Sequence, residues 1–365
     1  MSEVISATYQ LYLTEDESPE GKARGIALEQ TVEMPADCLP PDIAHRMVGR
    51  IRSLEPRADH WSLVIDYPVA ALGRELTQCL NLLFGNISLQ SGIRLVHVDW
   101  PRSLLQQWGG PALGVPGLRE QLGVHDRPLL CAALKPMGLS PQALAERCGA
   151  FARGGVDLIK DDHGLADQPD APFVDRLAAC QAAVEQANRE TGGRSLYLPN
   201  VTAAPGLLGQ RLAAARDAGC RMVLISPWLT GLESLRWARD EYGLALMAHP
   251  AMTGSLFLPQ HGISPELLLG ELFRIAGADA VIYPNVGGRF RFTAETCAGI
   301  NHGLRRGLEG LPAAWPTPGG GVDIKRAGHW KRAYGPDTIL LIGGSLYAQG
   351  DIQAAARDLM RAIRE

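Results

Sequence analysis

Four ionisable residues, Lys160, Asp161, Asp162 and His163, stand in a row directly after a short apolar run. Such side chains are costly to bury unless they are paired or hold a ligand. On a strand, Lys160 and Asp162 would share one face, and His163 would lie just beyond the strand end. A carboxylate, an imidazole and an amine that can be modified together predict a divalent-metal site. The alternative is a Lys–Asp ion pair beside a solvated histidine, and the four letters alone leave both open.

Two more residues that can carry a proton follow other apolar runs. Lys135 precedes Pro136, where a partly desolvated amine would serve as an acid or a base. A solvated surface lysine is the alternative. His249 stands between Ala248 and Pro250, and is either a hydrogen-bonded core histidine or a substrate ligand.

Glycines end two further runs, with Gly319, Gly320 and Gly321 in one cluster and Gly343 and Gly344 in the other. Backbone N–H groups at such positions can bind a phosphate, because glycine lets an anion approach closely. Tight turns are the alternative explanation.

The loop "NVGGRFRF" begins at Asn285, a candidate substrate contact at the end of an apolar run. Its glycines would let Arg289 and Arg291 close over an anion. Exposed loop cations are the alternative.

The elements that position these residues form one rhythm from about residue 128 onward, in which apolar runs alternate with helix-like stretches. The eight predicted strands are 128–134, 156–162, 195–201, 221–227, 244–250, 279–285, 313–320 and 338–344. Helices begin at Ser140-Pro141 and Ser264-Pro265, each with an N-cap and a proline at the first position. Eight such units predict a (β/α)₈ barrel with its site at the C-terminal ends of the strands. A doubly wound open sheet is the competing interpretation.

The first 120 residues have a different pattern. "VISATYQLYL" and "HWSLVIDYPV" predict half-exposed strands, and "PDIAHRMVGRIRSL" predicts an amphipathic helix. We therefore expect an α+β domain at 1–120 and a barrel at 121–365, joined through a Gly/Pro-rich linker at 106–128.

Composition narrows the function further. With 46% hydrophobic and 20% charged residues, a net charge of −4 and scattered Lys and Arg, the chain fits neither a nucleic-acid binder nor a membrane-surface protein. The 7 cysteines form no CxxC pair, and no signal peptide or apolar span is visible. These features predict a cytoplasmic protein with buried free thiols.

Several motifs resemble one family. "LKPMGLSP" and "GGVDLIKDDHGLADQ" resemble the core of ribulose-1,5-bisphosphate carboxylase/oxygenase (RuBisCO) and of its non-carboxylating relatives, the RuBisCO-like proteins. "IALEQTVEMP", "LLFGNISL", "LALMAHPAM", "PTPGGGVDI" and "LLIGGSL" are similar to further segments, in the same order. The resemblance implies a ferredoxin-like N-terminal domain, a TIM barrel and a homodimer, or a higher assembly, whose active sites form between subunits.

The resemblance also implies residue roles. Lys160 matches the lysine that CO₂ converts to a carbamate, and Asp162 matches a carboxylate ligand of Mg²⁺. Lys135 matches an acid/base lysine and His249 a substrate-contacting histidine. Glu29 and Asn86 match residues that reach the site from the neighbouring subunit.

Departures from the family pattern point away from carboxylation. His163 stands where the family core has Glu as the third metal ligand, so the metal is Mg²⁺ or Mn²⁺, or His163 has another role. Pro250 replaces an arginine that binds a second phosphate, Tyr283 replaces a histidine, and the 285–292 loop lacks the expected lysine. We therefore expect a small-molecule substrate with a single phosphate.

The shared first step of the family, enolisation, leaves three functions open. The favoured one is isomerisation of 5-methylthioribulose 1-phosphate in sulfur salvage. The second is decarboxylation, transcarboxylation or hydrolysis of a 3-oxo sugar-acid phosphate of the 3-oxo-isoapionate 4-phosphate type. The third is an inactive binding or regulatory homologue. A cationic contact from Arg289 would favour the acid, whereas Phe257, Phe290 and Trp228 around the far end would favour the thioether.

Overall fold

The computed structural model describes residues 3–73, 75–290, 292–322 and 324–364, which form two compact units. The first unit comprises Met1–Gly109, Met252–Leu268 and Leu308–Gly310. The second comprises Gly110–Ala251, Leu269–Gly307 and Leu311–Glu365. The chain first passes from one unit to the other at Gly109–Gly110. The predicted domain boundary after residue 120 stays a prediction.

The first unit has the ferredoxin-like order of elements. Its strands are β1 (Val4–Leu11), β2 (Arg50–Pro56), β3 (Trp61–Pro68) and β4 (Ile93–Asp99), with helices α1 (Pro19–Glu29), α2 (Pro41–Met47), α3 (Leu76–Phe84) and α4 (Arg102–Trp108). They pair antiparallel in the order β4-β1-β3-β2. Two short strands, β10 (Phe257–Leu258) and β11 (His261–Ile263), extend this sheet, and β11 runs parallel to β4. The predicted ferredoxin-like fold is confirmed.

One predicted helix is wrong in its second half. The segment 41–54 is helical only to Met47 and continues as β2 from Arg50. The turn packs closely, since a Cβ on Gly49 would lie 2.9 Å from Ile65 and Tyr67 side-chain atoms. β2 is an edge strand without a fully buried residue, so its sequence does not alternate between apolar and polar.

The second unit is a closed barrel of eight parallel strands. They are β5 (Leu129–Leu134), β6 (Leu158–Asp161), β7 (Leu196–Leu198), β8 (Met222–Ile225), β9 (Ala245–Ala248), β12 (Ala280–Pro284), β13 (Trp315–Gly319) and β14 (Ile339–Ile342). Each lies within a predicted strand, and β14 pairs with β5. A bridge between Asn200 and Leu224 links the β7 and β8 edges. The (β/α)₈ prediction is confirmed, and the doubly wound sheet is wrong.

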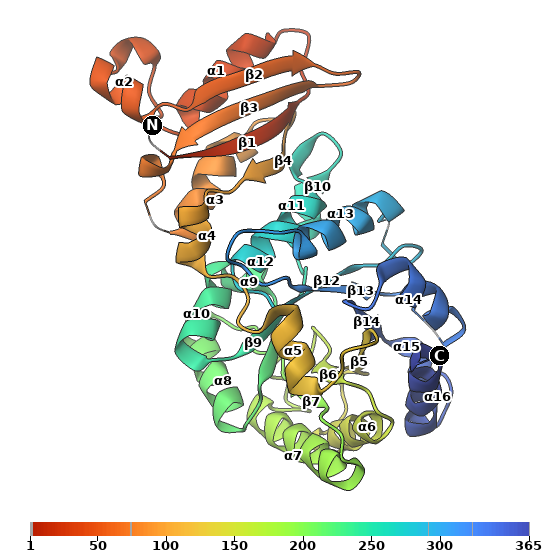
Figure 1. Ribbon diagram of the computed structural model, residues 1–365. Helices are drawn as coiled ribbons and strands as arrows, with labels where there is room; N and C mark the ends of the chain where they lie inside the picture. The colour runs from red at the N-terminus through yellow and green to blue at the C-terminus, as the bar shows by residue number, and fades with distance from the viewer. Residues whose placement is uncertain (1–2, 74, 291, 323, 365) are drawn as a thin grey trace. The chain divides into compact units, whose positions relative to one another are not determined.

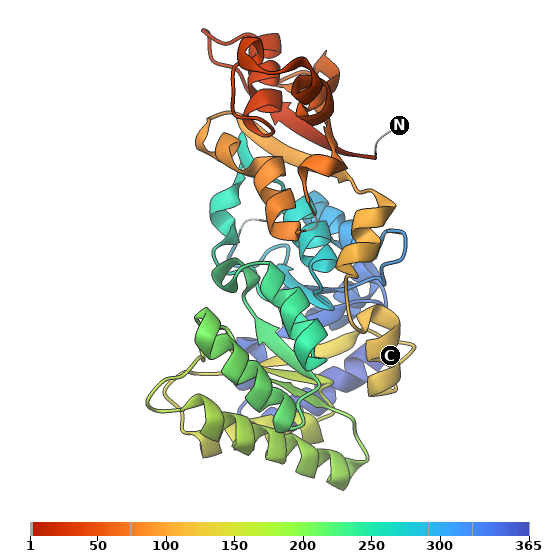
Figure 2. The ribbon, with the colours of Figure 1, turned by 90° about the vertical axis from the view of Figure 1, so that its left-hand side faces the viewer.

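Helices cover the outside of this barrel, as Figures 1 and 2 show for α7, α8 and α10 in green tones. The barrel helices are α6 (Pro141–Arg153), α7 (Phe173–Thr191), α8 (Pro205–Asp217), α9 (Pro227–Thr230), α10 (Glu233–Tyr242), α12 (Phe273–Ile275), α13 (Ala294–Arg305), α14 (Ala327–Tyr334), α15 (Gly344–Tyr347) and α16 (Ile352–Arg364), whereas α11 (Pro265–Leu267) belongs to the first unit. Ser140 and Ser264 cap α6 and α11 as predicted. A π-helical stretch, Leu268–Leu272, separates α11 from α12.

The predicted linker contains a helix, α5 (Gly114–Leu122), that packs on the barrel interior. Its apolar residues Val115, Leu118 and Leu122 belong to one buried cluster with strand residues such as Leu129 and Trp315. The i, i+3, i+7 spacing of the three places them on one face. Gly and Pro letters within α5 hid this helical pattern.

The predicted buried thiols are confirmed for all cysteines but one. Cys38 is exposed, and the other six cysteines are buried and free. In the part of the chain that the structure describes, no helix combines the length and apolar character that crossing a bilayer requires.

Candidate active site

Three strand ends of the barrel bring the predicted chemical residues together. Lys135 directly follows β5, Lys160 lies in β6 with Asp162 and His163 just beyond, and His249 directly follows β9. Because the carboxyl ends of parallel strands meet at one end of a barrel, these side chains face one region, as in other barrel sites.

An ion pair links the first two strand ends. Lys135 Nζ donates to Asp162 Oδ1 at 2.7 Å, and His163 Nδ1 lies 3.6 Å from the same oxygen. Burial alone would raise the pKa of Asp162, but the contacts of His163 and Lys135 and the charge of Lys160 outweigh it and lower the pKa. Asp162 is therefore ionised at neutral pH, the form in which a carboxylate binds a metal.

Lys160 is almost fully buried, with 2% of its surface exposed. Its Nζ donates to the Asp161 carbonyl oxygen at 2.9 Å. Burial lowers the pKa of Lys160, although the nearby Asp162 opposes this. A lowered pKa favours the neutral amine, and only that form can add CO₂ to become a carbamate.

The two histidines form a stacked pair. The rings of His163 and His249 lie 4.4 Å apart and within 7° of parallel. Burial, followed by the charge of Lys160, lowers the pKa of His249 to about 2, so this ring is neutral. The Ala251 N–H donates to His249 Nδ1 at 3.2 Å, which places the ring proton on Nε2. His249 thus offers an uncharged N–H donor.

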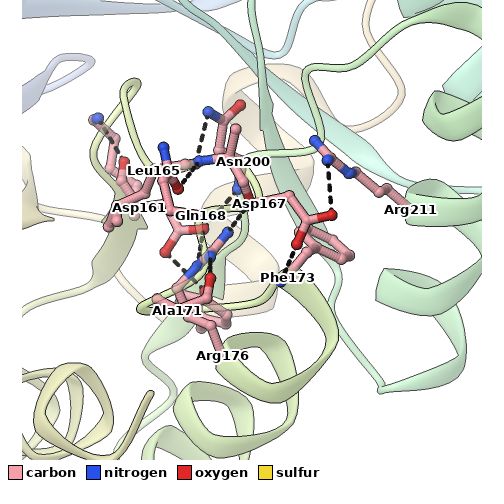
Figure 3. A network of polar contacts seen from close by, with 12 residues as sticks. Asp161, Leu165, Asp167, Gln168, Ala171, Phe173, Arg176, Asn200 and Arg211 are labelled. Atoms are coloured by element: carbon pink, nitrogen blue, oxygen red, sulfur yellow. Dashed lines mark hydrogen bonds and ion pairs between the residues drawn. The ribbon is translucent and has the colours of Figure 1, made fainter. Parts of the chain in front are cut away.

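A buried network holds the segment that carries His163 (Figure 3). The Asp161 carboxylate accepts hydrogen bonds from Arg176 Nε at 3.1 Å, from the Tyr197 hydroxyl at 2.8 Å and from the Asn200 N–H at 2.9 Å. Asn200 Nδ2 in turn donates to the carbonyl oxygens of His163 and Leu165, at 2.9 and 3.0 Å. The second Asp of the run is therefore the catalytic candidate, while the first is structural.

Lys135 has two fixing contacts that the sequence did not reveal. Its backbone N–H donates to Tyr347 Oη at 3.0 Å, and Arg147 donates to its carbonyl oxygen. The Tyr347 hydroxyl donates to the Ala133 carbonyl at 2.8 Å. Tyr347 is 212 positions from Lys135, so no local motif could have linked them.

The two glycine clusters present open backbone. Gly319 ends β13. Gly320 and Gly321 have φ of +95° and +68°, values that residues with a side chain rarely adopt. At Gly343 and Gly344, which follow β14, an added Cβ would meet nothing within 4 Å. The space beside Gly343 and Gly344 is open, and phosphate binding at either cluster stays a prediction.

Asn285 is fully buried, at 0% exposure, and braces these loops. Its N–H donates to the Gly319 carbonyl at 3.0 Å, and its Oδ1 accepts from the Tyr334 hydroxyl at 2.5 Å. Among described residues its Nδ2 has no partner. Trp330, which lies in α14 together with Tyr334, donates its Nε1 hydrogen to the Gly321 carbonyl at 3.3 Å. Asn285 therefore positions backbone, whereas direct substrate contact stays a prediction.

The residues expected around the far end of the substrate belong to different segments of the chain. Arg289 is exposed and its guanidinium lies 5.9 Å from the ring of Phe290, itself 62% exposed. Trp228 is half-buried in α9, and Phe257 belongs to the first unit. Arg291 lies outside the described residues.

Glu29 and Asn86 lie together in the first unit. Asn86 Nδ2 donates to Glu29 Oε1 at 3.0 Å and to Glu33 Oε1 at 2.6 Å. The three side chains line a polar pocket of about 240 Å³. The sequence did not single out Glu33, which has a positive φ of 50°.

The side chains at the barrel site can ligate a divalent cation if Lys160 carries a carbamate. Among the residues that the structure describes, no three His, Cys, Asp or Glu side chains converge as metal ligands. Asp162 and His163 supply one carboxylate and one imidazole. A carbamate on Lys160 would supply the third, anionic ligand that a hard cation prefers.

Comparison with known proteins supplies a family. Residues 114–362 match the family described as ribulose bisphosphate carboxylase large chain, catalytic domain. The 5-methylthioribulose-1-phosphate isomerase of Rhodospirillum rubrum is 40% identical over 355 residues, covering 96% of this chain and 93% of that one. The 2,3-diketo-5-methylthiopentyl-1-phosphate enolase of Geobacillus kaustophilus is 32% identical over 369 residues, with coverage of 95% and 89%. A solved RuBisCO-like protein from Rhodopseudomonas palustris has a TM-score of 0.89 at 38% identity, with coverage of 100% and 98%.

Proposed function

The chain belongs to the RuBisCO large-chain family as a RuBisCO-like protein, and we propose that it isomerises 5-methylthioribulose 1-phosphate through enolisation. One observation carries the proposal: the Lys135–Asp162 pair lies at 2.7 Å beside buried Lys160. This constellation can polarise a ketone and move its α-proton. The Rhodospirillum rubrum relative named for this reaction supports the choice of substrate.

The glycine clusters would anchor the phosphate. Their backbone N–H groups would donate to the phosphate, and glycine permits the close approach of an anion, because an added Cβ at Gly343 or Gly344 would meet nothing within 4 Å. A phosphate held there fixes the sugar chain along the barrel end, with its carbonyl toward the β5 and β6 strand ends.

Lys135 and His249 would act on the bound carbonyl compound. We assign the proton transfer at the α-carbon to Lys135, whose Nζ is oriented by Asp162. His249 donates its Nε2 proton in a hydrogen bond to a substrate oxygen. Because its ring stays neutral, this donor adds no charge that would compete with the enediolate.

A divalent cation would be held by Asp162, His163 and carbamylated Lys160. When bound, such a cation polarises the substrate carbonyl and stabilises enediolate charge. Mg²⁺ is the family expectation, and the imidazole of His163 makes Mn²⁺ a second candidate.

Glu29 and Asn86 would complete the site of a neighbouring subunit in a homodimer. Their mutual hydrogen bond at 3.0 Å presents a carboxylate and an amide together at a polar pocket. These groups can bind substrate hydroxyls.

The second candidate is enolisation of 2,3-diketo-5-methylthiopentyl 1-phosphate, which the Geobacillus kaustophilus relative favours. A 3-oxo-acid phosphate would need a cation for its carboxylate, and Arg289 is the described candidate on the loop after β12.

The test is α-proton exchange with deuterium, followed by NMR across ketose, diketone and 3-oxo-acid monophosphates, with CO₂ and either Mg²⁺ or Mn²⁺. We expect exchange and isomeric product with 5-methylthioribulose 1-phosphate, and at least a hundredfold slower exchange in K135M. The matched control is K331M, which changes a lysine of α14 outside the site. Exchange with none of the substrates, under either metal, would leave an inactive binding homologue as the answer.

A further inference from the structure

A basic pocket of about 450 Å³ lies where the C-terminal parts of α6 and α16 meet. Four arginines line it, Arg153 from α6 and Arg357, Arg361 and Arg364 from α16. Gly154 and Gly155, which follow α6, precede β6 by a few residues. The pocket is therefore at the N-terminal end of β6, the opposite end from Lys160 and Asp162.

Close helix packing creates the pocket. A Cβ added to Gly154 would lie 2.5 Å from the Ala356 Cβ, so only glycine allows this approach of α16. Gly155, with φ of +88°, turns the chain away toward β6. The two glycines and Met360 line the pocket together with the arginines.

The three arginines of α16 share one helix face. They are spaced i, i+4 and i+7, while Ala355, Ala356, Leu359, Met360 and Ile363 are the buried residues of α16. Arg357 and Arg364 are separated by about 10 Å along the helix axis, given a rise of about 1.5 Å per residue.

Like charges in one pocket repel, and the carboxylates present offset this only in part. Arg153 pairs with Glu190 at 2.7 Å, and Arg361 approaches Asp358 at 3.5 Å. Arg357 and Arg364 have no carboxylate partner within 4.0 Å among the residues described here. Helix C-termini favour cations, which accounts for arginines in the last turns of α6 and α16. It does not account for Arg357, which lies earlier, or for the convergence of all four on one cavity.

We propose that this pocket binds an oligophosphate, a chain of two or more linked phosphates. A guanidinium group can donate two parallel hydrogen bonds to the oxygens of one phosphate. The spacing from Arg357 to Arg364 exceeds the size of one phosphate. A chain of linked phosphates can therefore contact more of the arginines than orthophosphate can. Among the described residues that line the pocket there is no aromatic ring, and Met360 is the one large apolar side chain, so we expect the pocket to bind phosphates without recognising a nucleobase.

Calorimetric titration of the full chain with orthophosphate, pyrophosphate, tripolyphosphate and ATP, at constant ionic strength, tests this site. We expect tripolyphosphate to bind at least tenfold more tightly than orthophosphate. The double variant R357Q/R364Q should weaken tripolyphosphate binding at least tenfold, because two charge-assisted contacts are lost. Glutamine is a good helix former, so α16 should stay folded, which circular dichroism checks.

The matched control is R24Q/R332Q, which removes two exposed arginines of α1 and α14 and should change affinity less than twofold. Equal affinity in R357Q/R364Q and the wild type would overturn the proposal, as would an equal loss in the control. Binding of ATP tenfold tighter than tripolyphosphate would also contradict it, because the pocket would then recognise a base. The glycine clusters of the barrel site are unchanged in R357Q/R364Q, so any phosphate bound there contributes equally to the variant and the wild type, and the comparison does not depend on the enolisation activity.

Discussion

In the proposed metal site, His163 is the residue on which the metal preference would depend. A carboxylate binds hard Mg²⁺ better than an imidazole does, because it adds negative charge to the ligand set. We expect H163E to bind Mg²⁺ about tenfold more tightly than the wild type in the presence of CO₂. Calorimetric titration with Mg²⁺ measures this, with H125N, a change of an exposed histidine, as the control. An unchanged Mg²⁺ affinity would show that position 163 is not a ligand.

His249 makes the fold sensitive to acid. Its pKa is about 2 in the folded chain, below the ordinary value of about 6.5, so the unfolded state binds the proton more readily. This contribution is fully present above about pH 6.5 and is lost as the pH falls toward 2, at no more than about 1.4 kcal/mol per pH unit. Urea unfolding between pH 4 and 7 should show a shallower pH slope for H249N than for the wild type or H125N. Equal slopes in all three would contradict the neutral buried ring.

Among elements, α14 braces the glycine loop that we propose to bind phosphate, through the hydrogen bond of Tyr334 to Asn285. Y334F removes the hydroxyl that bonds to Asn285 Oδ1, at a stability cost of about 1 kcal/mol. We expect KM for the phosphorylated substrate to rise about tenfold while kcat stays near the wild-type value, because uniform binding is lost.

The matched control is Y283F, which removes a hydroxyl bonded to Asn301 Oδ1 at 2.6 Å in the same unit. It should cost similar stability and leave KM unchanged. If Y334F and Y283F have similar KM values for the phosphorylated substrate, the Tyr334 hydroxyl has only a structural role.

The success of sequence prediction differed between elements for physical reasons. Strands such as β5 and β8 are buried on both faces, so they appear as unbroken apolar runs. The edge strand β2 has no such signature. The helix α5 contains two glycines and a proline, which do not indicate a helix. In the site, strand ends predicted Lys135 and His249, whereas Tyr347 and Tyr334 come from distant segments and carry no local signal.

At the scale of the whole molecule, the proposed dimer makes a complementation prediction. If Asn86 serves a neighbouring subunit, K135M and N86A damage opposite halves of each site. Mixing the two inactive proteins under subunit exchange should restore up to about a quarter of wild-type activity, since random pairing leaves one intact site in each mixed dimer. Restored turnover is measured by the exchange assay, and a mixture of K135M with K135A is the control. No recovery despite verified exchange would place Asn86 outside the shared site.

The first unit takes Met252–Leu268 from the middle of the barrel sequence, and β11 pairs there with β4. During synthesis on the ribosome, the β4 edge therefore waits unpaired while more than half of the barrel is made. The first unit can complete its sheet only after residue 263 has emerged. An early pause or truncation would leave this edge open to other chains, so the order of emergence itself couples the maturation of the two units.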